Sequence, residues 1–218
     1  MKRLFDLAIA TAGLAIGAPV LAVLAVAIKL DSPGPALFSQ TRVGRARRPF
    51  RLLKLRTMTA GTGPHVTSSH DPRVTRIGAL LRKTKLDELP QLWNVLRGEM
   101  SIVGPRPEVP RYVEEYRPEW SPLLSVRPGL TDLASLTFRN EEHLLGLASD
   151  PERAYREIIM PMKLAVALRG LERRSVIQDA AIIARTAIAV VYRRASEDDP
   201  IVQEARRRIA DLERGLDR

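Results

Sequence analysis

The stretch 83-KTKLDELPQLWNVLRGEMSIVGPRP-107 decides the local fold, because it sets charged residues at both ends of a short apolar helix. Asp87 is a favoured helix N-cap, and Pro90 falls in the first turn, where a missing N–H costs nothing. Gly98 should end this helix. Apolar residues recur between these limits at the spacing of a helix face that packs inward: Leu89, Leu92, Trp93 and Leu96.

Two adjacent carboxylates, Asp87 and Glu88, stand at the start of this expected helix. Taken alone, such a pair only caps a helix and fills its first turn. A carboxylate at a helix N-terminus faces the positive end of the dipole, which keeps it ionised and suits a nearby phosphate or metal ion. The neighbouring residues include cations of the kind that clamp phosphates: Arg82, Lys83, Lys85, Arg97 and Arg106. The stretch therefore predicts an active site.

The chain has 218 residues, enough for one domain with a sizeable core. Lysine and arginine number 35 against 25 acidic residues, a net charge of +10 that suits nucleic acid, an anionic membrane face or a nucleotide substrate. Aromatic residues make up 5%, which gives little stacking surface for single-stranded nucleic acid. The absence of cysteine excludes a disulfide framework and a thiolate zinc site.

Residues 7–28 carry no charge over 22 positions, which at 1.5 Å per residue is enough to cross about 30 Å of hydrocarbon. No cleavage site of small residues follows, so we expect a retained membrane segment. Pro19, with Gly13 and Gly17 before it, predicts a kink. Hydropathy alone favours a single span. Basic residues on both sides of the segment favour a hairpin that enters and leaves on the cytoplasmic face.

Beyond the membrane segment, residues 36–44 and 48–58 alternate well enough to predict an antiparallel hairpin with a basic connection. Helices are expected over 73–83, within 108–120 and from Asp150, the last one interrupted at Pro161. Further sequence patterns predict a strand over 130–138, a helix over 175–194 and a charge-rich helix over 198–218.

The stretch DELPQLWNVLRGEMSIVGPRPE, residues 87–108, resembles the signature of the bacterial sugar transferases, which are monotopic phosphoglycosyl transferases. These enzymes load a sugar phosphate onto a membrane polyprenol phosphate. The resemblance extends to four other segments: SPGPALFSQTRVGR (32–45), LLKLRTM (52–58), VRPGLTDLAS (126–135) and FRNEE (138–142). Together with the apolar N-terminal segment, these cover most of residues 1–195.

The resemblance implies roles for named residues. Asp87 would be the nucleophile that attacks the sugar-bearing phosphate of a UDP-sugar and releases UMP, and it would also lie at the metal site. Glu88 would help to hold Mg²⁺ or would position a proton or a phosphate. Polyprenol phosphate, such as undecaprenyl phosphate, would then accept the sugar phosphate. Four arginines are expected on the substrate phosphates: Arg56, Arg82, Arg106 and Arg139. Asp179 occupies a family acidic position that would orient an active-site arginine.

The implied fold is α/β, mostly helical and α+β-like. It comprises a re-entrant membrane helix in 1–30, and a cytoplasmic-facing catalytic domain in 31–195 that contains the hairpin and interfacial amphipathic helices. Family members break the membrane helix at a Ser-Pro pair, where this chain has Ala18-Pro19. Residues 196–218 lie outside the resemblance and form an amphipathic helix expected to face a partner or a second copy. Its apolar stripe is Ile201, Ala205, Ile209 and Leu212.

The family resemblance also has implications for the location, the partners and the sugar specificity of the protein. The resemblance implies the bacterial inner membrane, contact with anionic lipids, a homodimer as one oligomeric state, and no nucleic-acid partner. Family members usually continue from Gly-Leu-Thr into Gly-Trp-Ala-Gln, but this chain continues into Asp132 to Ser135, which bears on sugar preference. Two alternatives are a membrane-tethered basic scaffold that binds anionic lipid or nucleic acid, and a polytopic transferase, which needs several spans where this sequence has one.

Overall fold

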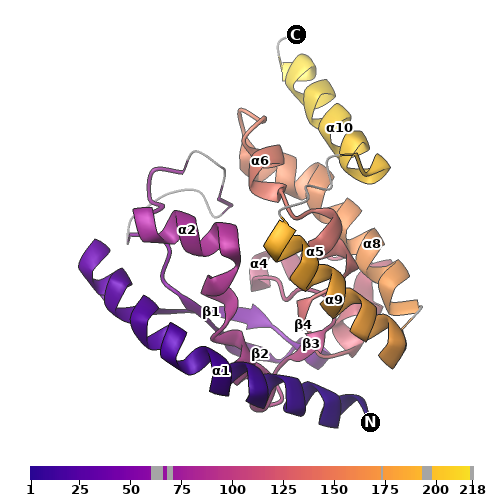
Figure 1. Ribbon diagram of the computed structural model, residues 1–218. Helices are drawn as coiled ribbons and strands as arrows, with labels where there is room; N and C mark the ends of the chain where they lie inside the picture. Colours follow the sequence, from indigo (N-terminus) through magenta and orange to yellow (C-terminus); the bar gives the residue numbers. More distant parts are fainter. Residues whose placement is uncertain (60–65, 68–70, 173, 193–197, 217–218) are drawn as a thin grey trace.

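The computed structural model describes residues 1–59, 66–67, 71–172, 174–192 and 198–216 (Figure 1). The α-helices are α1 (Lys2–Asp31), α2 (Arg76–Thr84), α3 (Gln91–Leu96), α4 (Pro110–Val113), α5 (Leu133–Thr137), α6 (Glu141–Leu145), α7 (Pro151–Ala154), α8 (Met160–Glu172), α9 (Val176–Tyr192) and α10 (Pro200–Leu216). Short turns of 3₁₀ helix are η1 (Arg45–Arg47), η2 (Leu86–Glu88) and η3 (Pro118–Ser125), and η4 (Tyr155–Ile159) is a π-helical turn. The strands are β1 (Leu37–Val43), β2 (Pro49–Leu55), β3 (Ser101–Val103) and β4 (Gly129–Thr131).

Helices dominate the fold, and the described strands form two separate pairs. β1 and β2 are antiparallel, with Leu37 opposite Leu55, so the predicted hairpin is confirmed. β3 and β4 pair in parallel, with Ser101 opposite Gly129. The expected strand over 130–138 is wrong beyond Thr131. Asp132 accepts a hydrogen bond from the Ser135 backbone N–H at 2.7 Å and so caps the start of α5 instead.

The apolar N-terminal segment is one continuous helix of 30 residues, long and apolar enough to cross a membrane. The helix is not divided at Ala18-Pro19, although it bends along its length (Figure 1). Both halves of α1 pack on the same body, which explains why a proline that removes one backbone hydrogen bond does not divide the helix. Ala10 belongs to the apolar cluster around α3, and Ile28 belongs to a second cluster with Leu55 and Leu81.

Polar contacts fasten the start of α1 to the domain. Lys2 Nζ lies 2.6 Å from Asp179 Oδ2, and Arg3 donates to the backbone oxygens of Val95 and Leu96. Asp179 thus pairs with a lysine of α1, so the expectation that it orients an active-site arginine is wrong. Six large apolar residues of α1 remain exposed: Leu4, Ile16, Val20, Val23, Val26 and Leu30. Figure 1 shows α1 lying along one side of the domain.

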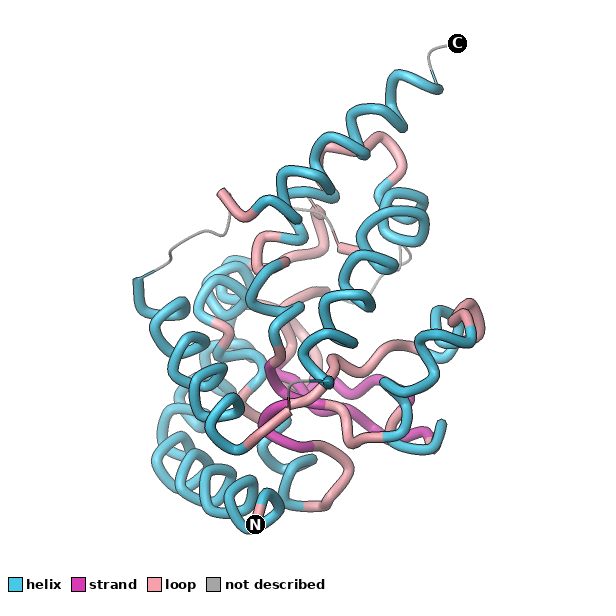
Figure 2. Tube along the Cα trace, turned by 90° about the vertical axis from the view of Figure 1, so that its right-hand side faces the viewer, coloured by secondary structure: helices cyan, strands magenta, loops and turns pink. Residues whose placement is uncertain are grey.

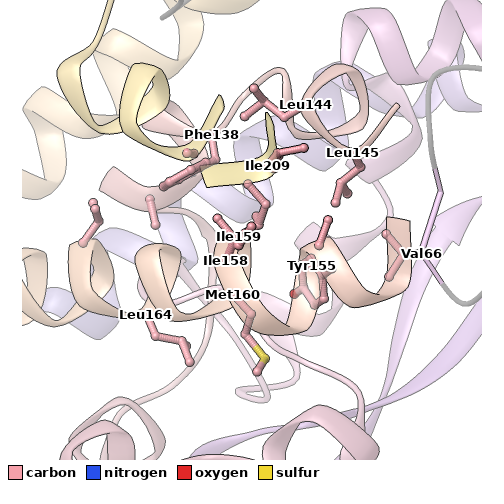
Figure 3. Packing of buried hydrophobic residues seen from close by; sticks show 14 of the residues in the cluster. Val66, Phe138, Leu144, Leu145, Tyr155, Ile158, Ile159, Met160, Leu164 and Ile209 are labelled. Carbon is pink, nitrogen blue, oxygen red and sulfur yellow. The ribbon is translucent and has the colours of Figure 1, made fainter. Parts of the chain in front are cut away.

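The largest apolar cluster lies among α4 to α8 and α10, toward the opposite end of the molecule from α1 (Figures 1 and 2). Ile209 of α10 is 1% exposed and packs in the cluster with Phe138, Leu144 and Leu145 (Figure 3). The predicted apolar stripe of α10 is present, but it covers the chain's own core. The expectation that this stripe faces a partner is therefore wrong, because α5 and α6 present apolar residues that α10 shields from water.

One other expectation needs correction. Trp93 was expected on the inward face of α3, yet it is 51% exposed, whereas Leu92 is buried. The other predicted residues of this face, Leu89, Leu92 and Leu96, do pack in the core, so Trp93 alone lies off it. Ile177 and Ile188 of α9 are exposed, as an interfacial amphipathic helix allows, while Ile182 faces the core. The α-helix that starts at Pro151 is interrupted by the π-helical turn η4 just before Pro161, as predicted, and the chain continues as α8.

Candidate active site

The two adjacent carboxylates lie in a tight connection between α2 and α3. Lys85 ends α2 in the left-handed conformation, with φ of 58°, and η2 then carries Asp87 and Glu88. Pro90 occupies the N-cap position of α3, where no side chain caps the helix. Asp87 is therefore not the N-cap that the sequence suggested, because a 3₁₀ turn separates it from α3. Both carboxylates are buried, with exposed fractions of 5% and 8%.

Arg106 holds Glu88 at two points. Its Nη1 donates to Oε2 at 3.2 Å and its Nη2 donates to Oε1 at 2.8 Å. This two-point geometry fixes the carboxylate as well as neutralising it. Burial raises the pKa of Glu88, but the charges of Arg106 and Lys54 outweigh burial and hold this pKa well below its ordinary value of 4.5. Glu88 is therefore a fixed anion.

Asp87 has a different environment from its neighbour. Lys54 Nζ lies 3.8 Å from Oδ2, and Oδ1 is buried without a hydrogen-bond partner among the described residues. Burial raises the pKa of Asp87 above its ordinary value, a shift that Lys54 opposes and the charge of Glu88 reinforces. Glu88 is thus held by hydrogen bonds, whereas Asp87 keeps an oxygen atom free to react or to bind.

Lys54 of β2 is the functional candidate that the sequence did not single out. Its Nζ lies between the carboxylates, 3.5 Å from Glu88 Oε1 and 3.8 Å from Asp87 Oδ2. Burial lowers the pKa of Lys54, while Glu88 opposes this shift. The signal in the sequence was only a lysine near the end of a strand that follows the membrane segment. Nothing in that pattern points to residues 87 and 88.

The four predicted arginines are placed differently. Arg106 forms its hydrogen bonds and ion pair with Glu88. Arg82 of α2 lies near them in sequence, and its guanidinium group contacts Glu142 Oε1 at 2.9 Å and Thr57 Oγ1 at 3.1 Å. Arg139 is partly buried, which lowers its pKa, and it has no ion-pair partner in the described part of the chain.

Arg56 is engaged elsewhere. Its guanidinium group donates to Ile28 O at 3.2 Å, to Ser32 O at 2.7 Å and to Pro33 O. These carbonyl groups lie at the end of α1 and just beyond it, where helix carbonyls lack partners within the helix. Arg56 thus fastens the end of α1 to the end of β2, and no hydrogen bond or ion pair among the described residues joins it to Asp87 or Glu88.

The carboxylate pair can also be tested as a metal site. Among the described residues no group of three or more His, Cys, Asp or Glu side chains is arranged to hold a metal ion. Mg²⁺, however, is commonly bound by one or two carboxylates together with substrate phosphates. The unpartnered Oδ1 of Asp87 is an available oxygen ligand in such an arrangement. The residues therefore fit a divalent ion that is shared with a phosphate substrate.

Comparisons with known proteins agree on one family. The model of the family described as bacterial sugar transferase matches residues 1–193. A Caulobacter vibrioides protein named UDP-glucose:undecaprenyl-phosphate glucose-1-phosphate transferase is 42% identical over 191 residues, which are 85% of this chain and 67% of that protein. An Escherichia coli K12 protein of the same name is 44% identical over 142 residues, 62% of this chain and 31% of that protein.

A third relative carries a different sugar in its name. The Aeromonas hydrophila protein named UDP-N-acetylgalactosamine-undecaprenyl-phosphate N-acetylgalactosaminephosphotransferase is 40% identical over 142 residues, 62% of this chain and 34% of that protein. The family match spans α1, both strand pairs, the carboxylate pair and α9. This protein therefore belongs to the bacterial sugar transferase family, and it is an enzyme of that family with an apolar N-terminal helix that indicates membrane association.

Proposed function

We propose that the protein transfers a sugar 1-phosphate from a UDP-sugar to a polyprenol phosphate such as undecaprenyl phosphate and releases UMP. This reaction would be the first membrane step in the assembly of a glycoconjugate. The observation that carries the proposal is the buried pair in η2, in which Arg106 pins Glu88 while Asp87 keeps a free oxygen. The relatives named above, which act on UDP-sugars and undecaprenyl phosphate, support the same reaction.

In the first half of the proposed reaction, an oxygen of Asp87 attacks the phosphorus that bears the sugar. A bond forms between this oxygen and phosphorus, and the bond from phosphorus to the bridging oxygen of the diphosphate breaks. The electron pair leaves with UMP. Arg106 and Lys54 place positive charge beside the carboxylates, where the phosphates must approach, which reduces the repulsion between two anions.

In the second half, a phosphate oxygen of the polyprenol phosphate attacks the same phosphorus, and the bond to Asp87 breaks. The products are polyprenyl diphosphate sugar and a regenerated Asp87 carboxylate. Glu88 remains ionised through both halves because Arg106 and Lys54 hold its pKa low, so it keeps the two cations in place. Mg²⁺ bound by Asp87 and Glu88 with the substrate phosphates would supply further neutralising charge.

The membrane geometry fits a lipid substrate. Polar contacts at Lys2 and Arg3 hold the start of α1, and Arg56 holds its end on the same body. We propose that α1 sits in the cytoplasmic leaflet of the bacterial inner membrane with both ends on the cytoplasmic face. The exposed arginines of the β1–β2 connection, Arg45, Arg47 and Arg48, would lie against anionic headgroups. The active site would then stand at the height of the polyprenol phosphate.

The proposal predicts that Asp87→Asn abolishes turnover. The test measures UMP release from a panel of UDP-sugars with Mg²⁺ and undecaprenyl phosphate, and searches the protein by mass spectrometry for a covalent sugar phosphate. We expect release and an adduct at Asp87 for the unaltered protein, and a rate at least about 10³-fold lower for Asp87→Asn. Asp150→Asn, a change at an exposed helix cap, is the control that should retain the rate.

Equal rates for the Asp87→Asn variant and the unaltered protein would remove Asp87 as the nucleophile. No UMP release from any donor, combined with salt-sensitive binding to anionic vesicles or nucleic acid, would instead support the membrane-tethered scaffold.

A further inference from the structure

A cavity adjoins the carboxylate pair on the side of Arg106. Its walls come from the end of β1, the turn 105–108, η3, the start of α5, and η4 with α8. The cavity is partly open to solvent, and about 40 Å³ of it is available to the centres of water-sized molecules. The side chain of Arg106 lines this cavity, and its guanidinium group bonds Glu88. The cavity therefore begins one side chain away from the carboxylates.

Asp132 brings an unpartnered acceptor to the cavity wall. The residue is 6% exposed, and its Oδ1 accepts the capping hydrogen bond from the Ser135 N–H. Its Oδ2 is buried and has no hydrogen-bond partner among the described residues. Burial raises the pKa of Asp132, and the Ser135 hydroxyl and backbone N–H oppose that shift. An unpartnered buried oxygen costs free energy that a hydrogen-bond donor of a ligand recovers.

Most other polar groups of the cavity wall are already paired. Lys163 Nζ lies 2.5 Å from Glu141 Oε2, and Tyr155 donates its hydroxyl proton to Glu108 Oε1 at 2.6 Å. Tyr116 differs, since its hydroxyl has no hydrogen-bond partner in the described part of the chain. Burial raises its pKa well above the ordinary value and keeps this hydroxyl protonated. Its ring is held edge-on against Trp120, with centroids 5.8 Å apart.

The remaining wall is largely apolar, with Leu123, Met160 and Leu164 among the residues that form it. The cavity wall therefore combines the unpartnered carboxylate oxygen of Asp132, the hydroxyl of Tyr116 and apolar surface. A ligand that matches it carries hydroxyl or N–H groups on a compact body with an apolar side. A pyranose ring has this chemistry, because its hydroxyl and amide groups project from a ring whose C–H groups form an apolar face.

We propose that this cavity receives the sugar ring of the nucleotide-sugar donor, and that Asp132 Oδ2 selects the sugar by accepting a hydrogen bond from one of its hydroxyl or N–H groups. This inference rests on the proposed function. Connectivity favours the sugar over uracil, whose N–H is also a donor. The sugar is joined by a single oxygen to the phosphorus that Asp87 attacks, whereas uracil is separated from it by the second phosphate and a ribose.

The test compares Asp132→Asn with the unaltered protein. Asparagine keeps one carbonyl oxygen for the Ser135 cap, but it sets an NH₂ group where the ligand also presents a donor. We measure kcat/KM for UMP release from pairs of UDP-sugars that differ by one hydroxyl or one acetamido group, and inhibition by UMP. We expect the preference ratio of one such pair to fall by about 10-fold or more while the inhibition constant of UMP changes by less than about 2-fold.

Two further variants keep the test interpretable. Asp150→Asn is the matched control, because it alters the aspartate cap of α7, another short helix, at an exposed position. It should leave every ratio unchanged. Should Asp132→Asn fail to fold, as judged by its thermal unfolding, Tyr116→Phe provides a second route. The Tyr116→Phe variant keeps the aromatic ring and removes the free hydroxyl. We expect it to shift the preference ratio of one UDP-sugar pair by about 3-fold or more.

Four outcomes overturn the inference. An equal loss of kcat/KM for all donors in Asp132→Asn shows that Asp132 does not select the sugar. Weakened inhibition by UMP in the same variant assigns the cavity to the nucleoside. Unchanged ratios in both Asp132→Asn and Tyr116→Phe leave the proposed function standing but exclude the cavity as the sugar site. Absence of UMP release from every donor by the unaltered protein overturns the proposed function and this inference together.

Discussion

Asp87 and Glu88 are adjacent in sequence, yet their surroundings give them opposite pKa shifts. Glu88 receives two hydrogen bonds from Arg106, whereas the nearest cation to Asp87 is Lys54, 3.8 Å from Oδ2. Desolvation acts on both, and it prevails only at Asp87. A nucleophile benefits from this difference, because an oxygen that accepts no hydrogen bond keeps its electron pair available.

Lys54 should control the pH dependence of the reaction. Asp87 must be ionised to attack, and its pKa lies above 3.8, so activity should fall on the acid side at a higher pH than an ordinary aspartate would give. Lys54→Met removes the charge that lowers this pKa. The acid limb should then move to higher pH, and kcat should drop by about 10²-fold. The profiles of kcat and of kcat/KM against pH check both effects.

Arg51→Met is the control for Lys54→Met. Arg51 lies on the same strand, but it is exposed and bonds Ser39 and Thr41. This variant should keep the pH profile of the unaltered protein. An acid limb that does not move in Lys54→Met would show that Lys54 has no electrostatic influence on the ionisation that limits the rate.

At the scale of elements, α2 packs closely against the end of the hairpin, and Gly78 lies at the point of contact. A Cβ atom added at Gly78 would lie 2.0 Å from Thr57 O, so α2 can approach this closely only because the side chain is absent. The same contact allows Arg82 Nε to reach Thr57 Oγ1 and allows Thr75 N to reach Thr57 O. Gly78 thus sets the position of Arg82 relative to β2.

Gly78→Ala should push α2 away from the hairpin. We expect a loss of about 2–4 kcal/mol in the free energy of unfolding, measured by chemical denaturation, together with reduced kcat/KM. Gly215→Ala is the control, because a Cβ at that helical position meets nothing within 4 Å. It should be neutral or slightly stabilising. Equal stability of the two variants would contradict the close packing of α2.

The helix α10 is a second element whose packing can be tested. Ile209→Ala removes a side chain that is 1% exposed within the largest apolar cluster, so we expect a loss of about 2–5 kcal/mol in unfolding free energy. Ile177→Ala on α9 changes a side chain that is 84% exposed and should cost less than about 0.5 kcal/mol. A neutral Ile209→Ala would mean that α10 does not cover this core.

At the scale of the whole molecule, α1 presents two unlike faces. One face carries buried residues such as Ala10 and Ile28, and the other exposes large apolar side chains along its length. Both ends are fastened to one body by Lys2, Arg3 and Arg56. An exposed apolar face of this length needs a cover other than water, and a bilayer provides it.

Charges on the outward face of α1 should release the protein from membranes. We expect the double change Ile16→Glu and Val23→Glu to abolish co-sedimentation with vesicles of bacterial lipids. Insertion of this exposed face would place two carboxylates in the hydrocarbon of the bilayer, which is unfavourable. Far-UV circular dichroism should remain unchanged. Leu147→Glu, at an exposed apolar position away from α1, is the control and should sediment as before. Continued sedimentation of the double variant would exclude this face as the membrane contact.

The sequence by itself determined those features that depend on neighbouring residues or on one element. They include the apolar helix, the β1–β2 hairpin, the helix end at Gly98, the helix starts at Asp150 and Ser175, and the family. Turn chemistry and periodicity act over a few positions, so they leave a local pattern. The family motif likewise marked Asp87, Glu88 and Arg106, which the fold then brings together.

Only the tertiary structure decided which distant residues meet. It brought Lys54 to the carboxylates, used Arg56 to hold α1, and left one oxygen of Asp132 unpartnered in a cavity wall. It also kept α1 continuous through Pro19 and turned the stripe of α10 inward. These outcomes depend on how whole elements pack against one another. Packing is set by the shapes of many side chains at once, and no short window of sequence records it.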